Sequence, residues 1–82
     1  MGVIYGILLS VPEKLVGRYG ERARRAIGAA IARADIVTFT WAEYRGDLAF
    51  VMLAGSKEGA ERTLTELSEM PVYVKIIGIE GG

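Results

Sequence analysis

The sequence predicts a single α+β domain in which four strands and two helices follow the order βαββαβ. Three observations predict it. Apolar residues recur alternately with the short period of a strand and the longer period of a helix. Proline or glycine stands where the period changes, as at Pro12, Gly46 and Pro71. The 82 residues suffice for one domain with a small core.

The first strand and the first helix are predicted from opposite patterns. Residues 3–11 are rich in aliphatic side chains, are too few for a core helix and are followed by a proline. Residues 12–34 carry apolar side chains at three- and four-residue steps, as an amphipathic helix does. Gly17 and Gly20 each weaken a helix by about 1 kcal/mol relative to Ala. We therefore expect a break there, with a regular helix only from Glu21.

A hairpin follows. Residues 36–44 alternate as a strand, and residues 48–54 form a second strand that is apolar on both faces. Between them, Arg45, Gly46 and Asp47 supply a turn of hairpin length.

The last helix and strand complete the order. Ser56 is placed to cap a helix whose apolar stripe runs from Ala60 to Met70, and Pro71 marks its end. Residues 72–79 form the last strand.

This order is the ferredoxin-like, split βαβ arrangement. Right-handed crossovers place both helices on one face of a four-stranded antiparallel sheet with strand order 4-1-3-2. The two central strands, residues 3–11 and 48–54, are apolar on both faces, although an antiparallel sheet that faces water should be polar on its free side. We therefore expect a homodimer or a higher homo-oligomer that uses the sheet face or its edges.

Which face is free stays open. One candidate face carries Ile4, Leu8, Ala49, Val51 and Leu53, and the other carries Tyr5, Ile7, Leu9, Phe50 and Met52. The residues we predict at the oligomer interface are Tyr5, Ile7, Leu9, Phe50, Val51 and Met52.

The composition excludes several kinds of chemistry. Without His or Cys, the chain has no imidazole base, thiol nucleophile, zinc site or disulfide. The spacing of its carboxylates suggests no metal site, and no motif points to a cofactor. Asn and Gln are also absent, which is typical of thermophile proteins. The apolar runs are too short for a membrane span and no signal peptide is recognisable, so a cytoplasmic location is expected.

Arginines follow one side of the first predicted helix. They are Arg18, Arg22, Arg25 and Arg33, with Arg24 nearby. They could form a nucleic-acid surface, but the ten basic and ten acidic residues balance. The second helix is acidic, with Glu58, Glu61, Glu66 and Glu69. Pairing between the two helices is therefore the favoured interpretation.

Other candidate groups lack an obvious partner. Asp35 is expected to end the first helix connection and Asp47 to serve the turn, because neither has a recognisable partner for acid–base work. Trp41 and Tyr44 could stack on bases, but the sequence lacks the basic-aromatic signature of RNA-recognition domains. Packing is the favoured role for both aromatic residues.

The hairpin segment Tyr44-Arg45-Gly46-Asp47-Leu48, followed by the strand to Leu53 and the helix capped by Ser56, resembles ACT-like regulatory domains. It is especially similar to the effector domain of the leucine-responsive regulator family. The resemblance implies dimerisation through the sheet, sometimes higher assembly, and small-ligand binding at subunit interfaces near the turns. Similar βαββαβ chains include dimeric barrel monooxygenases.

The leading hypothesis is a non-enzymatic, oligomeric module that senses a small molecule or serves in assembly. Ligand contacts would come from the first strand–helix connection and from the hairpin turn. Those residues are Ser10, Val11, Pro12, Arg45, Gly46 and Asp47. The alternatives are a dimeric barrel enzyme that uses Trp41, Tyr44 and an arginine in a pocket between sheet and helices, and a nucleic-acid binder that uses the arginines of the first helix.

Overall fold

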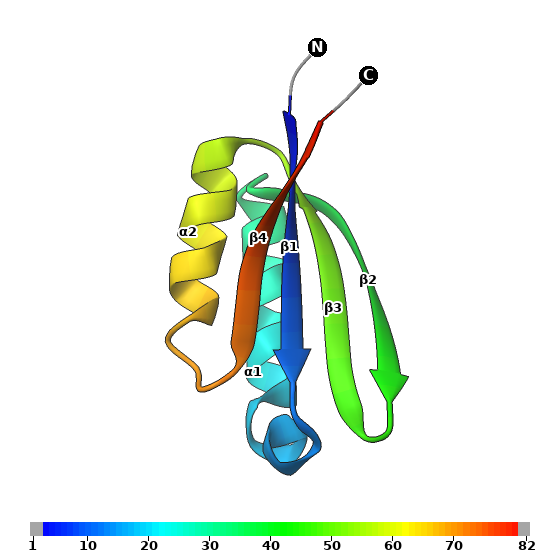
Figure 1. Ribbon diagram of the computed structural model, residues 1–82. Coiled ribbons are helices and arrows are strands. Elements are labelled where there is room, and N and C mark those ends of the chain that lie inside the picture. The colour runs from blue at the N-terminus through cyan, green and yellow to red at the C-terminus, as the bar shows by residue number, and fades with distance from the viewer. Residues whose placement is uncertain (1–2, 81–82) are drawn as a thin grey trace.

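The computed structural model describes residues 3–80 (Figure 1). Its elements are β1 (Val3–Val11), α1 (Glu13–Ala32), β2 (Ile36–Tyr44), β3 (Asp47–Ala54), α2 (Lys57–Leu67) and β4 (Tyr73–Glu80). The strands form one antiparallel sheet in the order β2-β3-β1-β4. Both helices lie on one side of the sheet, and in Figure 1 the sheet lies in front of α1. The predicted ferredoxin-like fold is confirmed.

The predicted break in the first helix is wrong, because α1 is continuous from Glu13 to Ala32. Gly20 lies on the buried side of α1, where a Cβ atom would stand 3.8 Å from the Leu48 side chain. Contacts of this buried side with the sheet offset the low helix propensity of glycine. The helix ends two residues earlier than predicted, because Ala34 adopts a left-handed φ of 64°.

Capping and turn chemistry set the other boundaries. The Ser56 hydroxyl accepts a hydrogen bond of 3.0 Å from the Gly59 N–H, so the predicted cap is confirmed. The hairpin turn between β2 and β3 contains two residues, Arg45 and Gly46, with φ values of 52° and 86°. Two positive φ values are typical of the type I′ turn, whose twist suits a two-residue hairpin.

The core lies between the helices and one face of the sheet. Ile7 and Leu9 of β1 pair with Met52 and Phe50 of β3, and all four are buried. Helix α1 adds Ala23, Ile27 and Ala30, and α2 adds Ala60 and Leu67. The small alanine side chains allow the helices to approach the sheet closely.

Within residues 3–80, neither helix has the length and apolar character that a crossing of the membrane requires.

Candidate functional site

The face of the sheet opposite the helices is apolar and uncovered within the chain. Side chains alternate along a strand, so this face receives the neighbours of the core residues. Ile4 is 47% exposed and Val51 is 43% exposed, compared with 0% for Phe50 next to Val51. We call this surface the open face and define it by Ile4, Leu8, Ala49, Val51, Leu53 and Ile77.

The structure therefore corrects most of the predicted interface residues. Ile7, Leu9, Phe50 and Met52 are buried beneath the helices, so they are core residues and cannot meet a partner. Tyr5 is half-buried and packs against the same core. Of the six predicted residues, Val51 lies on the open face. The alternative set, headed by Ile4, Leu8 and Val51, is the one that faces outward.

The open face is hollowed where β1 and β4 pair. A hollow of about 450 Å³ has apolar walls, to which Leu8 and Ala49 contribute. Three polar side chains also line it, from Ser10, Tyr73 and Lys75. Ser10 lies directly opposite Tyr73 in the β1–β4 register. The surface of the hollow is thus mainly apolar, and residues that bear two hydroxyls and one ammonium group contribute to its lining.

The two predicted ligand-binding segments lie next to each other at one end of the sheet. Because Pro12 has no polar side chain to cap α1, the Asp47 carboxylate accepts a hydrogen bond of 2.8 Å from the Glu13 N–H. A Cβ atom at Gly46 would overlap the Glu13 carboxylate, so the turn and the start of α1 are in direct contact. Asp47 is thereby engaged in tying the hairpin to α1.

The predicted ligand-binding residues therefore do not form one site, but lie in three different places. Val11 is fully buried and belongs to the core. Pro12, Arg45, Gly46 and Asp47 build the junction between turn and helix, where Arg45 lies over the Tyr44 ring at 5.2 Å. Ser10 points to the other side of the sheet, into the hollow of the open face.

A buried carboxylate joins α1, β2 and α2. The Asp35 side chain is 4% exposed. It accepts hydrogen bonds from Arg62 Nη2 at 2.6 Å, from Arg62 Nε at 3.1 Å and from Arg33 Nε at 3.0 Å. Hydrogen bonds from Arg62 and from Arg33 lower the pKa of Asp35 to about 2. Arg33 also pairs with Glu66 at 2.6 Å. We call these four residues the Asp35 clamp.

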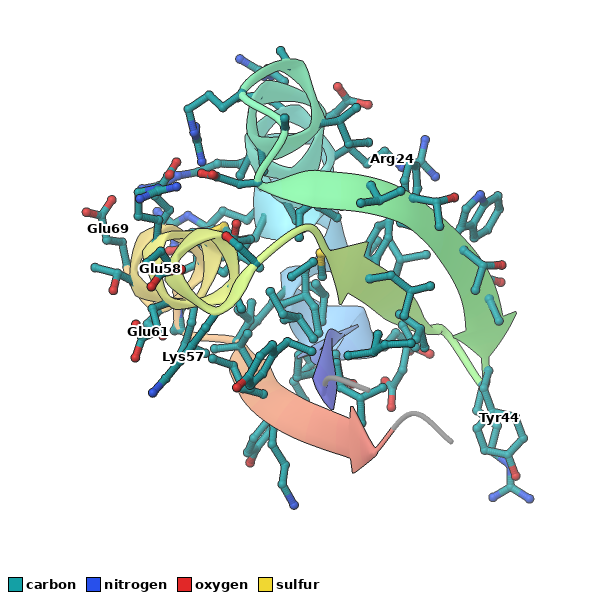
Figure 2. All side chains as sticks on the ribbon, turned by 90° about the horizontal axis from the view of Figure 1, so that it is seen from above. Arg24, Tyr44, Lys57, Glu58, Glu61 and Glu69 are labelled. Atoms are coloured by element: carbon teal, nitrogen blue, oxygen red, sulfur yellow. The ribbon has the colours of Figure 1, made fainter. Side chains whose placement is uncertain are left out.

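The predicted ion pairing between the arginines of the first helix and the glutamates of the second is confirmed only in part. Arg33 pairs with Glu66 across the two helices, as the charge pattern indicated. Between residues 3 and 80 the structure gives no ion pair to Arg18, Arg22, Arg24 or Arg25. Figure 2 shows the acidic side chains Glu58, Glu61 and Glu69 on the outer side of α2, away from Arg24.

The aromatic residues of β2 do not meet in one pocket. Trp41 lies opposite Phe50 on the helix side of the sheet, where the Arg24 guanidinium lies 5.3 Å from its ring centre. Tyr44 stands at the hairpin end and projects away from the body of the molecule (Figure 2). Across the part of the chain that the structure describes, no three potential metal-ligating side chains come together.

Comparison with known proteins adds one close relative and several structural neighbours. No protein-family model matches the chain. The uncharacterized protein MJ1462 of Methanocaldococcus jannaschii is 54% identical over 79 residues, which cover 96% of this chain and 95% of that protein.

Solved structures with little sequence similarity share the architecture. The uncharacterized protein TM1266 from Thermotoga maritima has a TM-score of 0.66 at 14% identity and covers 96% of this chain and 100% of its own. The C-terminal domain of the MgtC protein from Mycobacterium tuberculosis has a TM-score of 0.63 at 15% identity, with coverages of 93% and 86%. A Deinococcus radiodurans protein, inferred to be an antibiotic biosynthesis monooxygenase, scores 0.60 at 14% identity, with coverages of 99% and 93%. These likenesses show the fold alone.

Proposed function

The chain belongs to the same family as the uncharacterized protein MJ1462 of Methanocaldococcus jannaschii, and we propose that it is a non-enzymatic, regulatory module that assembles through its open face. One observation carries the proposal: Ile4, Leu8, Val51 and Leu53 form an apolar surface that no helix covers. Monomeric proteins rarely expose contiguous apolar patches beyond a few hundred Å².

A second copy is the occupant that suits this face. Ile4, Leu8, Val51 and Leu53 carry no charge, and Lys75, which lies opposite Leu8 on the same face, stands on the edge strand β4. Two copies can therefore meet without opposing like charges at the centre of the face. Two sheets pack face to face at aligned or orthogonal angles. Burying about 500 Å² of this apolar surface in each subunit contributes on the order of 12 kcal/mol per subunit, before subtracting the free-energy cost of the motion that the subunits lose on association. That margin favours association over a monomer.

The hollow supports a role in sensing a small molecule. Its volume of about 450 Å³ is in the range of small-molecule sites, and the polar residues Ser10, Tyr73 and Lys75 are among those that line its mainly apolar surface. A second sheet over the open face would close the hollow, so a ligand held there would be linked to association. The resemblance of the hairpin to ACT-like domains points in the same direction.

Sedimentation at micromolar concentration tests the assembly. We expect the unmodified chain to sediment at no less than twice its 8.9 kDa mass. Val51→Asp places a carboxylate in the open face and should weaken association at least ~100-fold, while circular dichroism keeps the signature of the fold. Ala29→Asp, on the exposed side of α1, is the matched control and should leave the mass unchanged.

Two outcomes would contradict the proposal. One is an unmodified chain that remains at 8.9 kDa throughout the micromolar range. The other is a Val51→Asp variant that stays folded and associates through the open face as tightly as the Ala29→Asp control.

The sensing part is tested by thermal shift with a panel of amino acids and small carboxylates. A ligand of the hollow should raise the midpoint of the unmodified chain and shift it less in Lys75→Ala and Ser10→Ala. Equal shifts in all three chains would place the ligand elsewhere.

A further inference from the structure

Helix α1 carries five exposed cations that have no partner in the chain. Within the part of the chain that the structure describes, none of them forms an ion pair with a carboxylate. Glu21 is the one acidic residue in this stretch of the sequence. The helix therefore presents a local surplus of positive charge, although the whole chain is formally neutral. We call this surface the α1 basic face and define it by Lys14, Arg18, Arg22, Arg24 and Arg25.

The compensating negative charge lies on the other helix. Figure 2 shows Glu58, Glu61 and Glu69 on the outer side of α2, away from Arg24. The two charges are thus separated across the molecule. An approaching polyanion is attracted to the α1 basic face and repelled from α2, so the charge distribution orients the encounter.

Two exposed aromatic rings adjoin the α1 basic face. Trp41 and Phe39 lie opposite the buried Phe50 and Met52, hence on the helix side of the sheet, and alternate residues of a strand are about 7 Å apart. Trp41 is 52% exposed and Phe39 is 41% exposed, and in Figure 1 the hairpin half of β2 stands clear of both helices. The Arg24 guanidinium lies 5.3 Å from the Trp41 ring centre, so it connects the rings to the basic face. We call Phe39 and Trp41 the aromatic strip.

The side of α1 that turns toward the aromatic strip is unobstructed. Gly17 and Gly28 stand seven residues before and four residues after Arg24, which places them on the same side of the helix. A Cβ atom at either glycine would meet no side chain and no other element within 4 Å. A bound chain can therefore approach the helix closely between the aromatic strip and the outer arginines.

We propose that this side of the molecule binds single-stranded nucleic acid, with bases stacked on Trp41 and Phe39 and phosphates held by the arginines of α1. Aromatic rings beside cations are the elements that such proteins use, because every base has a face that can stack and every phosphate carries a charge. Guanidinium groups also donate paired hydrogen bonds to phosphate oxygens. Glu43, which follows on the same side of β2, repels phosphate and so ends the strip at the hairpin.

The aromatic strip distinguishes a single strand from other polyanions. In a duplex the bases already stack on one another, so their faces are not free to meet Trp41. An acidic protein surface satisfies the arginines but offers no bases to the exposed rings. The site lies on the side of the sheet opposite the open face, so the inference does not depend on the proposed assembly.

The single tryptophan reports directly on stacking. Oligomers of deoxythymidine and of uridine, each about 15 nucleotides long, stand for DNA and RNA, and binding of either supports the proposal. At about 50 mM salt they should quench the emission of Trp41 and bind more tightly than a duplex of the same length. Trp41→Ala, measured by anisotropy of the labelled oligomer, should weaken binding ~5- to 150-fold. Trp41→Phe keeps a ring and should retain most of the affinity, while circular dichroism shows that both variants are folded.

The contribution of the cations is measured by salt dependence. For a single strand, each phosphate contact adds about 0.7 to the slope of the logarithm of the binding constant against that of the salt concentration. Arg25→Ala should therefore make the slope shallower by about 0.7. Lys57→Ala removes the same charge from α2, away from Arg24 in Figure 2, and should leave the slope unchanged.

Four results would overturn the proposal. They are binding weaker than about 100 μM at low salt, a duplex bound as tightly as the single strand, binding that leaves the Trp41 emission unquenched, and equal slopes for Arg25→Ala and Lys57→Ala. A sedimented mass that falls in Arg25→Ala without any nucleic acid would also overturn it, because the α1 basic face would then bind the acidic α2 of a second copy.

Discussion

The two faces of β3 differ in what covers them and hardly at all in composition. Phe50 and Met52 are fully buried under the helices, whereas Val51 is 43% exposed and Leu53 is 37% exposed. All four are apolar and lie on one strand. The apolar content of a central strand therefore predicts burial, but not whether the covering surface comes from the same chain.

The largest expected effect separates these two faces directly. Phe50→Ala should lower the free energy of unfolding by about 3–5 kcal/mol, because it leaves a cavity under the helices. Val51→Ala should lower the stability of the monomer by less than about 1 kcal/mol, because the side chain is already in contact with water. Denaturant unfolding at several protein concentrations measures both.

In that experiment, the effect of Val51→Ala on stability should grow with protein concentration, because the proposed association through the open face would bury Val51. If, at the lowest concentration, Val51→Ala lowered the free energy of unfolding as much as Phe50→Ala does, the two faces would contribute equally to the stability of a single chain.

The fold was predictable because each element has its own period and its own end signal. The assignment of faces was not, since Ile7 and Leu9 match Ile4 and Leu8 in character. One signal was nevertheless present: Gly6, Ser10 and Ala49 make the open set smaller and more polar than the set that faces the helices. The larger side chains are expected to face the helices, because side chains must fill the core between helices and sheet at close to crystal density.

The candidate site was predictable only where it follows from topology. The end of β1 and the β2–β3 turn lie at the same end of the sheet, so their proximity follows from the strand order. Lys75 and Tyr73 reach the hollow through the register of β1 with β4, which no short-range pattern specifies. The ion pair of Asp35 with Arg62 joins residues 27 positions apart and has no periodic signature.

A second prediction concerns the Asp35 clamp, the group of charged side chains that joins α1, β2 and α2 on the helix side of the sheet. The pKa of Asp35 is about 2 in the folded chain, below its ordinary value of 3.8. A depressed pKa contributes stability that is complete above about pH 4 and is lost as the pH falls through about 2. Asp35→Asn should therefore be less stable than the unmodified chain at pH 6, and the difference should shrink between pH 4 and pH 2.

Unfolding midpoints from pH 2 to pH 6 measure this effect, with Asp47→Asn, at the other end of the molecule, as the comparison. A difference between Asp35→Asn and the unmodified chain that stays constant over this range would mean that the carboxylate charge does not stabilise the joint. Association should not change, since the clamp lies on the helix side and away from the open face.

The smallest expected effect concerns the residue that turns the chain from the helix layer into the sheet. Ala34 holds a φ of 64°, and the next residue, Asp35, donates its N–H to the Ala30 carbonyl at 2.9 Å to close the helix end. Glycine adopts this conformation without the steric penalty that a Cβ atom brings. Ala34→Gly should therefore raise the free energy of unfolding by about 0.5–1 kcal/mol, which in a domain of this size corresponds to a midpoint higher by roughly 2–8 °C.

Ala29→Gly, inside α1 and exposed, is the matched control and should lower stability by a similar amount. Thermal unfolding of both variants decides the sign, and a loss of stability in Ala34→Gly would mean that the backbone of this joint is not strained.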